Sequence, residues 1–134
     1  MPYTLEWLVE RCLLLHRVYG DVTLDELHSM SNESRQLLES STTTVHSLVD
    51  LTGIRSHPTQ IKELTAAVNM NAPANLEWTL IVTESRLLRF LGALLTQLAR
   101  QRVATFPTIA SAIQFIAARD ATTDFDALLR RYDP

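Results

Sequence analysis

Three residue types that together perform hydrolytic chemistry lie close together in this sequence: Asp50, Ser56 and His57. In a hydrolase, a carboxylate orients an imidazole ring, and the imidazole takes the proton of a hydroxyl nucleophile. The serine of such enzymes is often held in a Gly-x-Ser-x-Gly turn, and this chain, with only 3 glycines, contains no such turn. We therefore predict no catalytic residues and no enzymatic activity.

The same segment suggests a second role for its hydroxyl groups. Ser56 and Thr59 flank Pro58 near the start of a predicted helix, where a Ser or Thr side chain can accept a hydrogen bond from a free backbone amide. Proline suits the first helical position because it has no amide hydrogen. A phosphate on either hydroxyl would also be stabilised by the helix dipole. We expect helix caps, keep phosphorylation as the alternative, and treat Asp50, Ser56, His57 and Thr59 as a candidate regulatory loop.

Metal and cofactor chemistry finds no support in the residue pattern. The histidines fall on different predicted elements without the spacing of metal ligands, at His16, His28, His46 and His57. The single Cys12 forms neither an internal disulfide nor a metal-binding motif, so a reducing cytoplasm is the expected location. We predict no metal and no cofactor.

The segment 85–100 carries the strongest sign of a binding surface. Its large apolar residues spread over more than one face of a predicted helix, whereas a helix that covers a sheet needs a single apolar stripe. We predict an interface or a ligand-binding rim formed by Arg86, Leu87, Arg89, Phe90 and Leu94, since arginine beside an apolar centre is typical of association surfaces. The alternative is that other segments of this chain cover the surplus apolar surface.

The elements that position these residues alternate between strands and helices. Runs rich in β-branched and apolar residues predict strands at 3–10, 13–19, 45–50, 77–83 and 102–106. Apolar residues at helical spacing predict helices at 24–39, 59–68 and 85–100, and a fourth helix capped by Thr108. A loop is expected at 69–75. The polar segment 120–134 is expected to end in a short helix.

This pattern predicts one α/β domain over residues 1–134, with its core at about 3–119. Repeated strand–helix units require a mixed, mostly parallel sheet, here of about five strands with about four principal helices. Hydrophobic residues make up 46% of the chain, which excludes disorder, and the net charge of −3 gives no basic excess for nucleic acid. The longest apolar run, 87–98, is too short to span a bilayer, which needs about 20 apolar residues. Nor do the first residues have the pattern of a signal peptide.

Two apolar segments resemble the STAS domains, the family of the anti-sigma-factor antagonists. The run Leu48-Val49-Asp50-Leu51-Thr52-Gly53-Ile54 looks like the strand before the phosphoacceptor loop of that family. The run Leu87-Leu88-Arg89-Phe90-Leu91, with the later segments 103–106 and 109–116, looks closer to the divergent SpoIIAA-like members. Nearly the whole chain is covered, and the implied fold is the STAS (SpoIIAA-like) fold.

The resemblance implies a signalling role but departs from the family at its regulatory site. Antagonists carry an Asp-Ser-Ser-Gly type motif after this strand, whereas residues 55–61 here read Arg-Ser-His-Pro-Thr-Gln-Ile, with Gln60 near the phosphoacceptor position. The prediction is a non-enzymatic regulatory module that lacks the usual phosphoacceptor motif. As partners, the resemblance implies a regulatory kinase or a sigma-pathway protein, and a homodimer is also expected.

A second function stays open. A pocket beneath the 85–100 helix, with Arg86 and Arg89 at its rim, would make the protein a binder of a small apolar ligand or a lipid headgroup.

Overall fold

A β-hairpin and three successive crossovers build one five-stranded sheet. The computed structural model describes residues 3–67, 73–98, 100–120 and 123–132. The strands lie side by side in chain order: β1 (Tyr3–Val9), β2 (Leu13–Asp21), β3 (Val45–Ser56), β4 (Leu76–Val82) and β5 (Arg102–Phe106). β1 runs antiparallel to β2, and β2 to β5 are all parallel to one another. β1 and β5 therefore form the two edges.

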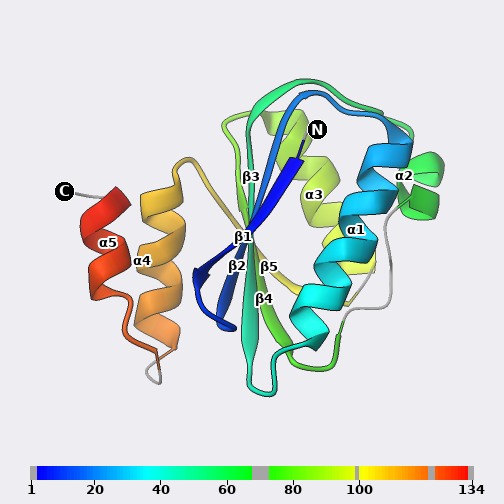
Figure 1. Cartoon of the computed structure of the whole chain (residues 1–134). Coiled ribbons are helices and arrows are strands. Elements are labelled where there is room, and N and C mark those ends of the chain that lie inside the picture. The colour runs from blue at the N-terminus through cyan, green and yellow to red at the C-terminus, as the bar shows by residue number, and fades with distance from the viewer. Residues whose placement is uncertain (1–2, 68–72, 99, 121–122, 133–134) are drawn as a thin grey trace.

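The helices divide between the two faces of the sheet, as Figure 1 shows with the sheet seen edge-on. The crossovers contain α1 (Leu24–Glu39), α2 (Ile61–Ala67) and α3 (Arg86–Leu98). Each connects a strand to its parallel neighbour in the same direction, and right-handed crossovers of that kind place their helices on the same face. After β5 the chain crosses to the opposite face, where α4 (Ile109–Arg119) and α5 (Asp126–Tyr132) lie.

Local sequence signals mark the starts of α1 and α4. Thr23 caps α1: its hydroxyl accepts from the Glu26 amide at 3.2 Å, and the Glu26 carboxylate accepts from the Thr23 amide at 3.0 Å. Thr108 caps α4 in the same way, with Ser111 as its partner. Each box satisfies amides that the first helical turn leaves free. Both expected caps are confirmed.

The two faces have differently built cores. On the α4–α5 face, buried residues from three strands and both helices form one continuous cluster: Leu13, Leu15, Leu48, Leu80, Val82, Ala112, Ile113, Ile116, Phe125 and Leu128. On the α1–α3 face the buried residues form two smaller clusters, one around Tyr3, Val18 and Val22 and the other around Leu14, Leu38 and Val45. Both smaller clusters contain residues from β1, β2 and α1.

The predicted fold is confirmed, with changes at three boundaries. β3 continues to Ser56, six residues past the expected end at Asp50, because β2 is also longer and pairs with it as far as Asp21. α2 accordingly begins at Ile61. The core extends past residue 119, since Phe125 and Leu128 are buried in it and α5 is a fifth helix. Of the expected loop 69–75, residues up to 72 lie outside the described part of the chain.

Candidate functional site

The candidate regulatory loop does not assemble as a catalytic group. Asp50 is buried, and its Oδ1 accepts from the Thr52 amide at 3.0 Å and from the Thr52 hydroxyl at 2.6 Å. Its Oδ2 lies 3.6 Å from Arg17 Nε. The ring of His57 instead contacts the carbonyl of Pro58, at 2.8 Å. In the described part of the chain no hydrogen bond joins Asp50 to His57, so the orienting contact of a hydrolytic triad is missing.

Ser56 belongs to an ion-paired cluster at the carboxyl ends of β2 and β3. Its hydroxyl donates to Asp21 Oδ1 at 2.7 Å. Arg55 donates to both oxygens of the same carboxylate, from Nε at 3.2 Å and from Nη2 at 2.7 Å. The bonds from Arg55, followed by that from Ser56, lower the pKa of Asp21 to about 2. The Ser56 hydroxyl is therefore held against a charged carboxylate.

The expected capping roles in this loop are wrong for Ser56 and unsupported for Thr59. Ser56 is the last residue of β3, and α2 begins only at Ile61. The residue before α2 is Gln60, whose carbonyl accepts from the Leu64 amide at 3.0 Å. The cause is the longer β3, which moves the strand end to the position where the sequence predicted a cap.

The outer face of α3 presents an apolar row that includes Leu87, Phe90 and Leu94, three of the residues expected at an interface; Leu91, expected to lie in a row with Leu87 and Leu98, is buried instead. Leu87, Phe90 and Leu98 are 48%, 60% and 52% exposed, and Leu94 is half-buried. Residues spaced three, four and four apart lie on one side of a helix, so these four side chains form one stripe. Arg86 and Arg89 are also exposed on α3. We call Leu87, Phe90, Leu94 and Leu98 the outer stripe.

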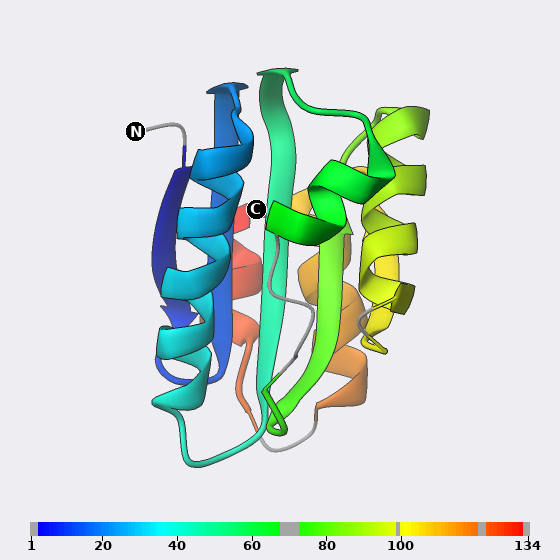
Figure 2. The ribbon, with the colours of Figure 1, turned by 90° about the vertical axis from the view of Figure 1, so that its right-hand side faces the viewer.

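The inner face of α3 borders a cavity of about 240 Å³. The cavity lies between the sheet and all three crossover helices, with Leu88, Leu91 and Leu95 of α3 in its wall. Figure 2 shows this face, where α2 lies between α1 and α3. Gly92 brings α3 close to the sheet, since a Cβ atom there would lie 2.7 Å from Ile81 Cδ1. The predicted pocket beneath this helix is present, but the described residues that line it include neither Arg86 nor Arg89.

A buried polar cluster forms part of the cavity wall. His16 of β2, Ser34 of α1 and Ser47 of β3 are all buried and all line the cavity. His16 Nδ1 lies 3.4 Å from the carbonyl oxygen of Leu48 and 3.2 Å from Ser47 Oγ, and Nε2 contacts Ser34 Oγ. Burial lowers the pKa of His16 to about 4. The ring is therefore neutral near pH 7, with Nδ1 donating to the carbonyl and Nε2 accepting from Ser34.

Comparison with solved structures identifies the architecture. An uncharacterised protein of the DUF3478 family from Shewanella loihica PV-4, described as having a SpoIIAA-like fold, aligns with a TM-score of 0.59 and 13% identity over 84% of this chain and 90% of that chain. The anti-sigma factor antagonist SpoIIAA, in its unphosphorylated form, aligns with a TM-score of 0.53 and 15% identity over 87% and 96%. This chain has the SpoIIAA-like fold. The resemblance to STAS domains is thereby confirmed at the level of the fold.

Other comparisons add no narrower relationship. No protein-family model and no curated protein matches the sequence. In the described part of this SpoIIAA-like chain, no helix has both the length and the apolar character to cross a membrane. Those same residues contain no group of three or more His, Cys, Asp or Glu side chains arranged to hold a metal ion.

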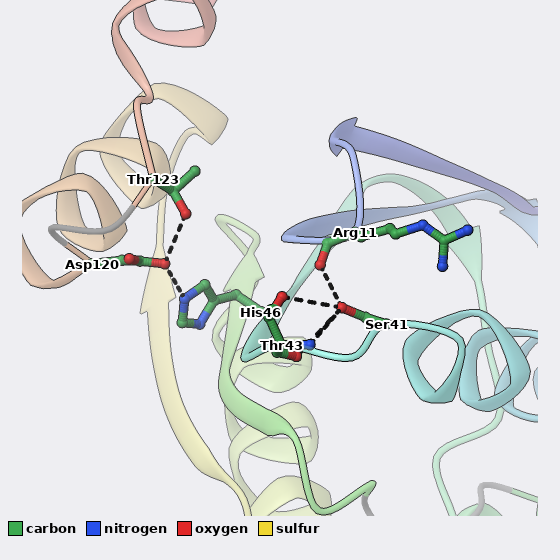
Figure 3. Close-up of polar contacts among 6 residues, drawn as sticks. All are labelled: Arg11, Ser41, Thr43, His46, Asp120 and Thr123. Atoms are coloured by element: carbon green, nitrogen blue, oxygen red, sulfur yellow. Dashed lines mark hydrogen bonds and ion pairs between the residues drawn. The ribbon is translucent and has the colours of Figure 1, made fainter.

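A second buried histidine connects the SpoIIAA-like sheet to its α4–α5 layer. His46 of β3 is fully buried, and its Nε2 lies 3.0 Å from Oδ2 of Asp120, the C-cap residue of α4 (Figure 3). Thr123 donates to the same oxygen at 3.4 Å. Within the described residues His46 Nδ1 has no hydrogen-bond partner, so no hydroxyl nucleophile faces the ring. The pair acts as a contact between layers.

The sequence prediction missed both buried histidine sites, although one had a visible signal. Ser34 follows Leu27 and Met30 on the apolar stripe of α1 and precedes Leu38 on it, so it is a polar residue at a core position. Ser47 likewise alternates with Val45 and Val49 on one face of β3. Polar residues at core positions require partners, and pairing these two would have indicated the cluster.

Proposed function

We propose that this protein is a non-enzymatic, STAS-like regulatory module that binds another protein through the outer stripe of α3. The observation that carries the proposal is the exposure of Leu87, Phe90 and Leu98 on one side of a single helix. Scattered apolar residues on a surface need no explanation, whereas a continuous row marks an interaction site. α3 also packs chiefly on the edge strand β5, so the stripe lies at one end of the sheet.

The charge around the stripe suggests what the partner presents. Between Glu84 and Asp120 the sequence has no acidic residue, and the two arginines of α3 itself, Arg86 and Arg89, are exposed beside the stripe. A complementary surface would combine apolar side chains with a rim of Asp or Glu. We propose a protein of a regulatory pathway as the partner, of the kinase or sigma-pathway type. Self-association through the same stripe is the competing outcome.

Regulation by phosphorylation is not part of the proposal. The usual acceptor motif is absent, and the hydroxyl of Ser56 donates to the carboxylate of Asp21. A phosphate at Ser56 would meet that like charge, although Arg55 is close enough to offset it. The separation of Asp50 from His57 supports the absence of enzymatic activity. The single free thiol of Cys12 fits a cytoplasmic location.

The Phe90→Glu variant tests the proposal, because it places a charge at the most exposed point of the stripe. Wild type and variant serve as baits for proteins from a lysate of the source cell, with quantitative mass spectrometry, and sedimentation velocity reports self-association. We expect at least one protein that is retained by wild type and depleted about tenfold or more by the variant, because a buried unpaired charge is costly at an interface.

A matched control changes an exposed aromatic residue elsewhere. Tyr19→Glu alters a 39% exposed ring on β2, away from α3, and should retain the same proteins as wild type. The proposal fails if Phe90→Glu and Tyr19→Glu both capture the same proteins as wild type and wild type is a monomer.

A further inference from the structure

The cavity between the sheet and α1, α2 and α3 is partly open to solvent, and its volume is too large for an ordinary packing gap. Protein interiors are packed as densely as organic crystals, and the few voids they contain are mostly close to the size of a water molecule. The volume here is about 240 Å³, and apolar side chains of all three helices line it. The buried clusters on this face are built on β1, β2 and α1, so neither fills the space beneath α3. The side chains of the α1–α3 face therefore leave an unfilled volume between the helices and the sheet.

The lining of the cavity is mostly apolar and has almost no charge. Besides the cluster of His16, Ser34 and Ser47, its polar side chains include the pair Thr79 and Gln101, which are hydrogen-bonded to each other at 2.6 Å. Each of the three helices contributes apolar side chains to its walls, for example Leu27 of α1, Leu64 of α2 and Leu95 of α3. Among the described lining residues, Arg35 is the only Asp, Glu, Lys or Arg, and it pairs with Glu39 at 2.7 Å. His16 is neutral near pH 7 because burial lowers its pKa to about 4. A charged molecule would find no opposite charge left for it inside.

The polar cluster retains unused hydrogen-bonding capacity. A serine hydroxyl offers one donor and two acceptor positions. Ser34 uses its proton on His16 Nε2, so both its acceptor positions remain. Ser47 keeps its own proton, because the His16 Nδ1 atom 3.2 Å away is a donor, whose proton is directed to the Leu48 carbonyl, and cannot accept from it. The two hydroxyls together can therefore donate one hydrogen bond and accept another, which is the complement of an alcohol.

We propose that this cavity binds an uncharged small molecule with an apolar body and one hydroxyl group, which hydrogen-bonds to Ser34 and Ser47. Apolar walls with a few placed polar groups are the usual make-up of a ligand site. An apolar cavity of about 150 Å³ is filled by benzene, so by proportion this one holds roughly ten non-hydrogen atoms. The site uses the inner face of α3 and is independent of the protein interface proposed for its outer stripe.

Octan-1-ol is a suitable probe, because it has the expected size and a single hydroxyl group. Binding is followed by NMR titration of backbone amides, with octanoate and 1-chloroheptane as comparison probes. We expect saturable binding of octan-1-ol with shifts at Ser34 and Ser47, and at least about tenfold weaker binding of octanoate at pH 7, because its charge would be buried without a partner.

Two variants separate the apolar and polar parts of the site. Val49→Phe places a ring on the cavity floor in β3 and should abolish octan-1-ol binding, whereas Ala118→Phe adds the same ring on the exposed side of α4 and should not. Ser47→Ala leaves the volume almost unchanged. It should weaken octan-1-ol binding roughly fivefold and leave 1-chloroheptane binding unaltered, because one hydrogen bond is lost.

The proposal is overturned if octan-1-ol does not saturate, if octanoate binds equally well, or if both Val49→Phe and Ser47→Ala leave binding at the wild-type level. Phe90→Glu should keep wild-type affinity for octan-1-ol, since Phe90 does not line the cavity. Loss of the protein partner in that variant, with the ligand retained, distinguishes failure of one proposal from failure of the other.

Discussion

Helices cover both faces of the sheet, yet the two faces are packed differently. On the α4–α5 face, ten buried residues form one continuous core, and a buried His46–Asp120 contact joins the layers. On the α1–α3 face, the buried residues divide into two clusters beside a cavity of about 240 Å³. The contrast predicts that the α4–α5 face contributes more to stability than the α1–α3 face, where both proposed binding surfaces lie.

α3 is the element in which this division is clearest. Its inner residues, such as Leu91 and Leu95, border the cavity, and its outer stripe faces solvent. A helix that served only to cover the sheet would need the inner apolar surface but not the outer stripe. Both proposed binding functions therefore depend on the same helix from opposite sides.

The largest expected difference between the faces concerns their packing. Ile113→Ala removes three carbons from a fully buried position in the α4–α5 core and should cost about 3–4 kcal/mol of unfolding free energy. Leu95→Ala removes three carbons from a half-buried position beside the cavity and should cost about 1 kcal/mol, because fewer contacts are lost there. Urea unfolding followed by circular dichroism measures both losses. Equal losses would mean that the α1–α3 face is as tightly packed as the other.

A second difference concerns pH, because the α1–α3 face buries a neutral histidine. Burial lowers the pKa of His16 to about 4, below its ordinary value of 6.5, so the unfolded chain binds a proton more readily than the folded chain. The contribution to stability is complete above pH 6.5 and is lost as the pH falls from 6.5 towards 4. It amounts to roughly 3 kcal/mol at most.

Urea titrations at pH 7, 6 and 5 test this for wild type and for His16→Gln. Glutamine replaces the ring with a polar amide that does not titrate. The variant should lose less stability than wild type between pH 7 and pH 5, and carboxylates elsewhere contribute equally to both proteins. Parallel curves would show that His16 is not kept neutral by burial.

The sequence predicted the fold because its signals are local and repeated. Apolar runs identified all five strands, and helical spacing together with the Thr23 and Thr108 caps identified α1 to α4. The end of β3 was misplaced because it depends on pairing with β2 as far as Asp21, a long-range contact that no local pattern reports. The handedness of the crossovers then places α1, α2 and α3 on one face of the sheet.

The candidate site was predictable only where it depends on one element. The outer stripe was visible because Leu87, Phe90 and Leu94 belong to a single helix whose apolar residues exceed what one face can bury. A cavity beneath that helix was predicted, but Arg86 and Arg89, which were expected at its rim, do not line it. The cluster of His16, Ser34 and Ser47 combines β2, α1 and β3, so its members meet only in the folded chain.

The smallest expected effect should be the same on both faces, because it is local. Thr23→Ala on α1 and Thr108→Ala on α4 each remove a hydroxyl that accepts from a backbone amide, at 3.2 Å and 3.1 Å. Each change should cost about 1 kcal/mol, and the corresponding Thr→Ser changes should cost little, since serine caps equally well. Urea unfolding of the four variants measures this. A loss at Thr23 several times larger than at Thr108 would show that α1, without a continuous core beneath it, depends on its cap to stay in place. The faces would then differ in how their helices are anchored as well as in how they are packed.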